Sequence, residues 1–329
     1  MKFYLAPLEG VTNYIYRNAY HHHFEKLDKY FTPFITTNQQ LKLSTREMKE
    51  INPEHNAALF VVPQILTNKS DEFLKTAEII QSYGYNEINL NLGCPSNTVV
   101  AKNKGSGFLF MRDALNRFLE DIYSQTHIEI SIKTRHGKFE HEEFYELVKI
   151  FNQYPIKELI VHPRITKDMY KNTPNLDVFE QALEDIKAPV CYNGDLFTTA
   201  DFVKISERFK NIDTFMFGRG VIGNPALIAH IKYGRHIERS VLRSFHDTLY
   251  EDYKTVMYGD RNVLYKMKEM WFYMIHLFEH PEKHAKRIKK CEKLHEYDAI
   301  VNAMFSDLKL IDAPMAYRQV VEDLLQKKR

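Results

Sequence analysis

A cysteine inside a loop-forming segment is the first residue in the chain that suggests chemistry. Cys94 lies in Asn-Leu-Gly-Cys-Pro-Ser (91–96), where glycine and proline indicate a loop over a pocket and not a packed element. A free thiol has a pKa of about 8.5, so it is mostly protonated at neutral pH and can act as a general acid. The motif has no second cysteine, which argues against a redox pair or a zinc site. An inert buried thiol is the alternative, and the loop favours the acid.

A lysine and a histidine come at the ends of two β-rich runs further along the chain. Lys133 begins Lys-Thr-Arg (133–135), and His162 begins His-Pro-Arg (162–164). A fixed cation beside the N1–O2 edge of a flavin stabilises the anionic reduced ring, which is how a protein tunes this cofactor. Surface polar residues and an ordinary hydrogen-bonded histidine are the alternative interpretations.

Two glycine-containing turns follow later in the chain. They are Asn-Gly-Asp (193–195) and Gly-Arg-Gly (218–220). Glycines let backbone N–H groups approach a phosphate, and barrels of alternating strands and helices often bind phosphate after their last two strands. Arg219 would add a charge-assisted hydrogen bond. The alternative is that both segments are only tight turns.

The elements that must position these residues are short β-rich runs separated by segments of helix length. Eight such runs occur in the first 220 residues, at 3–8, 30–36, 58–66, 87–92, 129–135, 158–164, 189–195 and 214–219. Helices are expected between them, for example at 70–83, 113–124, 141–151, 176–186 and 199–209. This alternation predicts right-handed crossovers and a parallel sheet. Eight units in about 230 residues match an α/β fold of the TIM (β/α)₈ barrel type, with a doubly wound sheet as the alternative.

In a TIM barrel the carboxyl ends of all strands surround one mouth, where the active site is built. Seven of the eight runs end in informative motifs: Ala-Pro-Leu-Glu-Gly (6–10), Pro-Gln (63–64), Asn-Leu-Gly-Cys-Pro (91–95), Lys-Thr-Arg (133–135), His-Pro-Arg (162–164), Asn-Gly-Asp (193–195) and Gly-Arg-Gly (218–220). One polar strand end means little. Seven that converge on one rim predict an active site there.

The pattern of strands stops after about residue 235. Segments near 241–258, 262–278, 280–291 and 297–305 show helical periodicity. We expect the core of a small helical bundle to include Met267, Met270, Trp271, Met274 and Ile275. The chain is therefore predicted to form a catalytic barrel domain over residues 1–235 and a small C-terminal all-helical domain over residues 236–329.

The net charge of +2 hides an asymmetry along the chain. Residues 230–329 hold 19 Lys and Arg against 15 Asp and Glu, whereas residues 1–229 hold 26 against 28. Much of the excess lies in 283–293, which includes Lys286, Arg287, Lys289 and Lys290. A basic run beside a near-neutral body predicts contact with a polyanion, and a solvated helix face is the alternative.

Composition bounds the class of protein. No stretch approaches the roughly 18 uninterrupted apolar residues of a membrane span. The first residues read as a strand and lack the long apolar region of a signal peptide. Three widely spaced cysteines argue against a disulfide framework. We expect a cytoplasmic protein that uses neither membrane nor metal. No motif fixes the oligomeric state, and a monomer is the default expectation.

Taken in order, these motifs resemble the tRNA-dihydrouridine synthase family over nearly the whole chain. The resemblance rests on Leu-Ala-Pro-Leu-Glu-Gly-Val-Thr (5–12), Asn-Leu-Gly-Cys-Pro-Ser (91–96) with a downstream Gly-Ser-Gly, Lys-Thr-Arg (133–135), His-Pro-Arg (162–164), Asn-Gly-Asp (193–195) and Gly-Arg-Gly (218–220). Any one of these motifs alone would be weak, and together they are specific. Leu8 stands where many relatives carry methionine, Pro63 precedes Gln64, and Gly-Ser-Gly-Phe replaces Gly-Ser-Ala-Leu, which affects the expected substrate fit.

The resemblance implies an FMN-dependent reduction of a uridine in tRNA, with NADPH as the reductant of the flavin. The implied FMN-binding residues are Pro7, Leu8, Gln64, Lys133, His162, Asn193, Gly194, Asp195, Gly218 and Arg219. It implies that Cys94 protonates C5 after hydride reaches C6, and that Asn91, Arg135 and Arg164 surround the flavin and target base. The target base would have to be flipped out of the RNA to reach the barrel mouth, and the helical tail with the loop lysines Lys102 and Lys104 would hold the RNA backbone.

Three alternatives remain open at this point. The same chemistry can act on a ribosomal RNA uridine, because no local motif encodes the target position. An FMN barrel that acts on a small molecule, like dihydroorotate dehydrogenases or old-yellow-type reductases, would explain the flavin features but not the basic tail. A barrel that binds RNA without catalysis would leave Cys94, Lys133 and His162 unexplained.

Overall fold

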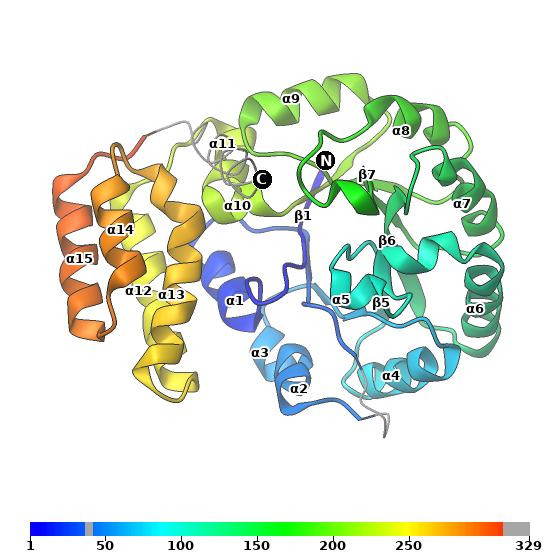
Figure 1. The fold of residues 1–329 in the computed structure, drawn as a ribbon, viewed down its shortest axis with the longest axis horizontal. Coiled ribbons are helices and arrows are strands. Elements are labelled where there is room, and N and C mark those ends of the chain that lie inside the picture. The colour runs from blue at the N-terminus through cyan, green and yellow to red at the C-terminus, as the bar shows by residue number, and fades with distance from the viewer. Residues whose placement is uncertain (37–41, 312–329) are drawn as a thin grey trace. The chain divides into compact units, whose positions relative to one another are not determined.

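The computed structural model describes residues 1–36 and 42–311. They form two compact units (Figure 1). The first comprises Met1–Gly10, Asp28–Asp195 and Arg208–Phe217. The second comprises Val11–Leu27, Leu196–Glu207 and Gly218–Arg329, of which residues 312–329 lie outside the described part. The predicted division into residues 1–235 and 236–329 stays a prediction.

The first unit contains one parallel sheet in the order β3-β2-β1-β9-β8-β7-β6-β5-β4. Its strands are β1 (Lys2–Leu5), β2 (Lys29–Phe31), β3 (Val61–Val62), β4 (Gln64–Ile65), β5 (Glu87–Leu92), β6 (Glu129–Gly137), β7 (Leu159–Ile165), β8 (Val190–Tyr192) and β9 (Thr214–Phe217). Every pairing between them is parallel. Each strand overlaps one of the eight runs expected from the sequence, with β3 and β4 sharing the run 58–66, and β1, β2, β6 and β7 extend one or two residues beyond their runs.

The two ends of this sheet order, β3 and β4, are consecutive in the chain and separated only by Pro63. Proline lacks an N–H group, so it interrupts a ladder. Its carbonyl nevertheless accepts a hydrogen bond from the Asn89 N–H at 2.8 Å. Because β3 pairs with β2 and β4 pairs with β5, the interrupted strand joins both ends. The sheet is therefore a closed barrel with eight strand positions, and the TIM barrel prediction is confirmed.

Amphipathic helices cover the outside of the barrel. They are α4 (Ser70–Ser82), α6 (Arg112–Gln125), α7 (Glu143–Phe151) and α8 (Leu176–Leu183), and neighbours in this series pack side by side (Figure 1). In α6, for example, the buried residues are Leu115, Phe118, Leu119 and Ile122, at the i, i+3, i+4, i+7 spacing of one helix face. Shorter elements of this unit are α2 (Thr45–Ile51), α3 (Pro53–Asn56), α5 (Asn97–Val100), η1 (Gly105–Phe110) and η2 (Thr166–Asp168).

The second unit is helical. It contains α1 (Tyr14–His23), α9 (Thr199–Arg208, whose last residue belongs to the first unit), α10 (Arg219–Gly223), α11 (Leu227–Tyr233), α12 (Arg239–Val256), α13 (Asp260–Met274), η3 (Ile275–Leu277), α14 (Glu282–Lys290) and α15 (Leu294–Asp307). The predicted stripe Met267, Met270, Trp271, Met274 and Ile275 is buried. The Trp271 indole N–H donates to the Tyr297 hydroxyl at 2.7 Å. The expectation of a helical C-terminal region is confirmed.

Within the described residues, no helix combines the length and apolar character that crossing a membrane requires.

Candidate active site at the carboxyl end of the barrel

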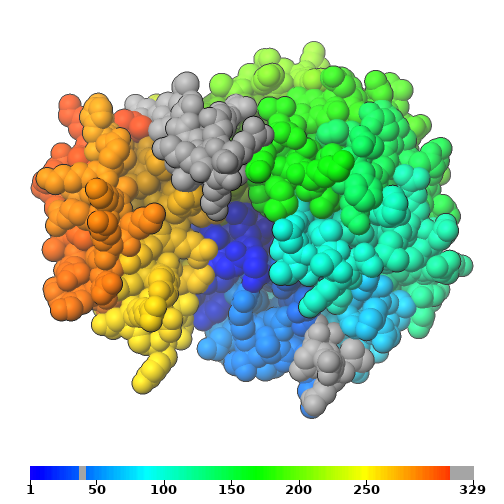
Figure 2. Space-filling model, viewed as in Figure 1, coloured from blue at the N-terminus to red at the C-terminus, as the bar shows by residue number. Residues whose placement is uncertain are grey.

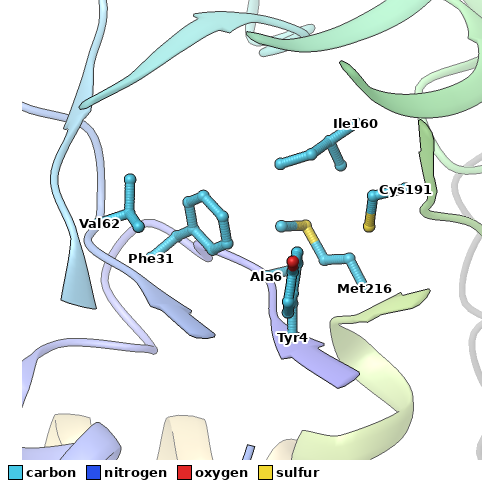
Figure 3. Close-up of a cluster of buried hydrophobic side chains, with 7 residues drawn as sticks. All are labelled: Tyr4, Ala6, Phe31, Val62, Ile160, Cys191 and Met216. Atoms are coloured by element: carbon cyan, nitrogen blue, oxygen red, sulfur yellow. The ribbon is translucent and has the colours of Figure 1, made fainter. Parts of the chain in front are cut away.

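A hydrophobic cluster fills the barrel below the predicted site. Figure 3 shows its side chains pointing toward one another from six strands: Tyr4, Ala6, Phe31, Val62, Ile160, Cys191 and Met216. Side chains along a strand return to the same face every second residue. Two residues beyond members of the cluster, toward the carboxyl ends of the strands, stand Leu8, Gln64, His162 and Asn193. Four predicted site residues therefore share the inward-facing register one layer above this cluster.

A chain of hydrogen-bonded side-chain amides runs across three neighbouring strands, β4, β5 and β6, near this level. The Gln64 Nε2 group donates to Asn89 Oδ1 at 2.7 Å, and Asn91 Nδ2 donates to Gln64 Oε1 at 2.7 Å. Asn89 Nδ2 in turn donates to the Ser131 hydroxyl at 3.0 Å. All four side chains are buried. Because every amide group has a partner, the chain fixes the orientation of Gln64 and Asn91.

The same chain holds the cysteine loop. Asn91 Oδ1 accepts hydrogen bonds from the backbone N–H groups of Gly93 at 3.0 Å and of Cys94 at 2.9 Å. The Cys94 carbonyl accepts from the Ser106 N–H at 3.1 Å and the Ser106 hydroxyl at 3.0 Å. Gly105 makes this approach possible, because its φ is +57° and a Cβ there would lie 2.7 Å from the Cys94 carbonyl oxygen.

The surroundings of the Cys94 thiol favour its protonated form. Cys94 is a part-buried free cysteine. Burial raises the pKa of its thiol, and nearby Arg135 and Lys133 only partly oppose that effect. A pKa raised above the ordinary thiol value leaves Cys94 protonated at neutral pH, which is the form that can donate a proton.

Lys133 is a cation near the carboxyl end of the barrel, beside Arg135. It lies on β6 opposite Asn91 of β5, and it is part-buried. Among residues 1–36 and 42–311, its ammonium group has no hydrogen-bond or ion-pair partner. Burial lowers its pKa from the ordinary value of 10.5 to about 8, and the nearby Arg135 adds to that effect. A buried ammonium without a carboxylate is costly unless a ligand supplies the missing partner.

Arg135, on β6, contacts the carboxyl-terminal segments of the two neighbouring strands, β5 and β7. Its Nε donates to the Gly93 carbonyl at 2.9 Å, its Nη1 to the Ile165 carbonyl at 2.9 Å, and its Nη2 to the Met169 carbonyl at 2.8 Å. The guanidinium also lies 5.5 Å from the centre of the Tyr170 ring. Arg135 thus ties the cysteine loop to the loop after β7.

Arg164 orients His162. Its Nη1 donates to His162 Nε2 at 2.7 Å, and the guanidinium makes a two-pronged ion pair with Asp195. Because a guanidinium only donates, His162 Nε2 must be the unprotonated acceptor nitrogen and Nδ1 carries the proton. The hydrogen-bond network therefore assigns one tautomer to His162.

The glycine-containing turns belong to different units. In the first unit, Asn193 Nδ2 donates to the Met216 carbonyl at 2.9 Å, and Gly194 is buried. In the second unit, Gly218 precedes α10, and Arg219 lies 5.1 Å from the centre of the Phe197 ring. A Cβ on Gly220 would lie 2.0 Å from the Leu196 carbonyl oxygen, so this turn requires glycine.

Pro7 and Leu8 are part-buried and follow β1.

The basic run forms α14 in the second unit. Lys286, Arg287, Lys289 and Lys290 are exposed, whereas His284 and Ile288 are buried on the other face. The four cations therefore lie on the solvent side of an amphipathic helix.

Sequence reasoning missed Asn89, Ser106, Ser131 and Tyr170 as supporting residues. The period of two from Gln64 and Asn91 signals an inward-facing Asn89, but nothing local indicates that Ser106 bonds to the Cys94 carbonyl. In the described part of the chain, no group of three or more His, Cys, Asp or Glu side chains is arranged to hold a metal ion.

Comparison with known proteins gives a family match for the chain. The family model described as dihydrouridine synthase (Dus) matches residues 4–310. The tRNA-dihydrouridine synthase B of Pasteurella multocida is 30% identical over 227 residues, which cover 69% of this chain and 67% of that protein. A probable tRNA-dihydrouridine synthase of Staphylococcus aureus (strain Mu50) is 28% identical over 233 residues, covering 68% and 69% respectively.

Solved structures resemble the fold. A variant of NCR from Zymomonas mobilis aligns with a TM-score of 0.51 and 15% identity, over 74% of this chain and 90% of that chain. Morphinone reductase in complex with tetrahydroNAD aligns with a TM-score of 0.50 and 11% identity, over 72% and 88%. At such low identity these two support the barrel alone. The family match spans nearly the whole chain, so this protein belongs to the dihydrouridine synthase family.

Proposed function

We propose that the chain reduces a uridine in tRNA to 5,6-dihydrouridine in the cytoplasm, with FMN as bound cofactor and NADPH as reductant. Family membership supports the reaction class. The observation that carries the proposal is Lys133, whose part-buried ammonium group lacks a protein partner among the described residues beside a protonated Cys94. An uncompensated cation and an acid in one barrel mouth suit a substrate that gains a hydride and a proton.

The donors of the mouth fit an FMN. Lys133 would hold the N1–O2 edge, with His162 and the fixed Gln64 amide as further polar contacts. The turn Asn193–Asp195, together with Pro7 and Leu8, would hold the rest of the flavin. Gly218 and Arg219 would bind its phosphate. When bound and reduced, a flavin supplies the hydride.

Cys94 would supply the proton. The C5=C6 bond of uracil is conjugated to a carbonyl, so hydride at C6 leaves an enolate that needs one proton at C5. The Cys94 Sγ–H bond breaks as the C5–H bond forms, and the thiolate then recovers a proton from water. The reaction balances with one NADPH and one proton consumed per uridine. A pKa raised by burial favours this role, because the thiol stays protonated until the substrate arrives.

Asn91, Arg135 and Arg164 would act on this chemistry through position. Their polar atoms bind the cysteine loop, the loop after β7, and His162 with Asp195. We infer that they hold the surfaces against which the flavin and target base lie.

The exposed cations of α14 would bind the RNA backbone, and the target base would leave its stack to enter the barrel. Changing Lys286, Arg287, Lys289 and Lys290 to alanine should weaken RNA binding and reduce the slope of log affinity against log salt by about 1 to 3. Lys254→Ala is the control, because Lys254 pairs with Glu251 at 3.0 Å on α12. Unchanged binding of the quadruple variant at several salt concentrations would leave α14 as solvated surface.

The decisive experiment is expression in a bacterial host that lacks its own dihydrouridine synthases, followed by mass-spectrometric mapping of tRNA and rRNA. Dihydrouridine restored at a tRNA position is the expected result, and the Cys94→Ala variant should not restore it. Product in rRNA alone would replace the tRNA substrate by a ribosomal one. No product from flavin-loaded protein would favour a small-molecule substrate.

A further inference from the structure

A pair of exposed aromatic rings, with lysine ammonium groups placed over them, lies outside the site described above. We call Phe110, Lys138, Phe139 and Lys167 the rim patch. The rings of Phe110 and Phe139 meet edge to face with centroids 4.9 Å apart, and they are 55% and 37% exposed. Lys138 Nζ lies 5.5 and 5.0 Å from the two ring centres, and Lys167 Nζ lies 5.6 Å from that of Phe139.

The rim patch stands at the carboxyl end of the barrel. Phe110 ends η1, Lys138 and Phe139 follow β6, and Lys167 lies in η2 after β7. Figure 2 shows the cyan and green segments that include η1 and η2 side by side on one face of the first unit. The same elements serve the site, since η1 contributes Ser106 to the Cys94 carbonyl and Arg135 binds the carbonyls on both sides of η2.

The turn that carries Phe139 is fixed before any ligand arrives. The Glu143 carboxylate accepts hydrogen bonds from the backbone N–H groups of Lys138, Phe139 and Glu140, at 3.2, 2.7 and 2.8 Å. A Cβ on Gly137 would lie 2.7 Å from the Glu143 Cβ, so the turn and α7 are closely packed. The ring of Phe139 is thus presented on a rigid support, which lowers the entropy lost on binding.

The charge of the rim patch distinguishes between a nucleic acid and an apolar protein as its ligand. The ammonium groups of Lys138 and Lys167 have no carboxylate partner among the described residues, although Glu140 is exposed nearby. Exposed aromatic rings with unpaired cations beside them are what single-stranded nucleic acid uses, since bases stack on the rings and phosphates meet the cations. An apolar protein partner would leave both ammonium groups without a counter-charge.

We propose that the rim patch stacks an unpaired base near the target uridine and binds an adjacent phosphate. This inference rests on the proposed RNA substrate, and it concerns a contact of the barrel itself, separate from α14. It predicts that the rim patch affects how tightly RNA binds more than how fast bound uridine is reduced.

The test uses the full-length, flavin-loaded enzyme and unmodified tRNA from a host without dihydrouridine synthases. The double variant Phe110→Ala with Phe139→Ala should raise KM for RNA by about tenfold, with a much smaller change in kcat. Oxidation of NADPH without RNA and the melting temperature report whether the flavin site and fold remain intact. Phe60→Ala is the matched control, because Phe60 is 57% exposed and lies 5.6 Å from a lysine Nζ, but just before β3 at the opposite end of the barrel.

Two further variants identify the contact. Replacing both phenylalanines by leucine keeps apolar area but removes the ring face, so KM should rise as in the alanine variant. Recovery with leucine would overturn stacking and favour an apolar protein contact. Lys138→Ala with Lys167→Ala should reduce the salt slope of RNA binding by about 1. If the wild type is active and the double phenylalanine variant has the same KM for RNA, this inference is wrong but the proposed function stands. If the wild type itself forms no product in RNA, the proposed function is wrong.

Discussion

Both ends of the barrel contain charged side chains that are largely buried. The lysines at the two ends differ in whether a carboxylate lies beside them. At the amino end, Lys29 Nζ lies 2.8 and 3.0 Å from the carboxylate oxygens of Glu87. The Tyr4 hydroxyl donates to Glu158 at 2.9 Å, and Lys29 lies 4.0 Å from that carboxylate. At the carboxyl end, Lys133 has no comparable partner among the described residues.

This difference in pairing indicates that the charges at the amino end contribute to stability, whereas Lys133 at the carboxyl end serves function. A buried charge with a partner recovers part of its lost hydration, whereas an unpaired one weakens the fold. Burial raises the pKa of Glu158, so even the paired end pays a desolvation cost. At the carboxyl end Arg164 pairs with Asp195, but Lys133 has no such partner among the described residues, which is expected if a ligand provides the missing charge. Variants at each end can test this interpretation.

The largest expected effect is at the carboxyl end. Cys94→Ala removes the proposed proton donor, so dihydrouridine formation should fall by about 10²- to 10⁴-fold. Oxidation of NADPH by the bound flavin should continue, because that step needs no proton at C5. Single-turnover product formation and NADPH consumption, measured in parallel, check both statements. Full product formation would remove Cys94 from the reaction.

At the amino end, Lys29→Met should lower the free energy of unfolding by about 2–4 kcal/mol, because it leaves the Glu87 and Glu158 carboxylates without their cation. Urea denaturation measures this change. Activity per folded molecule should stay the same, since Lys29 lies away from the mouth. The double variant Lys29→Met with Glu87→Leu should recover part of the loss. A stability unaffected by Lys29→Met would mean that solvent already screens the pair.

Lys133→Met should act in the opposite direction and raise the free energy of unfolding, by about 1–2 kcal/mol once partial solvent access is allowed for. The pKa of Lys133 is lower in the folded protein than the ordinary 10.5, so the unfolded chain binds more protons. The advantage of the variant should be complete below pH 8 and disappear as the pH rises toward 10.5. Urea denaturation across this range measures it. A destabilised variant at pH 7 would contradict the comparison. Uridine reduction should be lost as well.

The closed barrel could be predicted because its signals are local. Eight β-rich runs and amphipathic helices such as residues 112–125 carry their periodicity in the sequence itself. The break at Pro63 was visible, but its effect was not, because it depends on pairing with β2 and β5. Helix α1 was missed, since its mean hydropathy is low and its apolar stripe consists of tyrosine, isoleucine and alanine.

The site residues likewise include some that local sequence signals predict and some whose contacts only the fold shows. Residues on the inward register, such as Gln64 and His162, follow from strand ends and a period of two. The partners of Arg135 do not, because Gly93 and Met169 are 42 and 34 residues away in the chain. Sequence reasoning placed Arg135 near the flavin and base, and the structure adds that three of its N–H groups bind backbone carbonyls. Contacts between distant residues need the fold.

The pairing of β1 with β9 means that one edge of β1 lacks its partner strand during most of protein synthesis. Lys2 lies opposite Thr214 and Leu5 opposite Phe217, so one edge of β1 has no partner until roughly 210 more residues have been made. At about 5–20 residues per second, a ribosome needs on the order of 10–40 s for that length. During this interval Phe3, Tyr4 and Leu5, all buried in the finished protein, are open to chaperones or to wrong partners. Slowing translation before residue 214 should therefore lower the yield of folded enzyme without changing one amino acid.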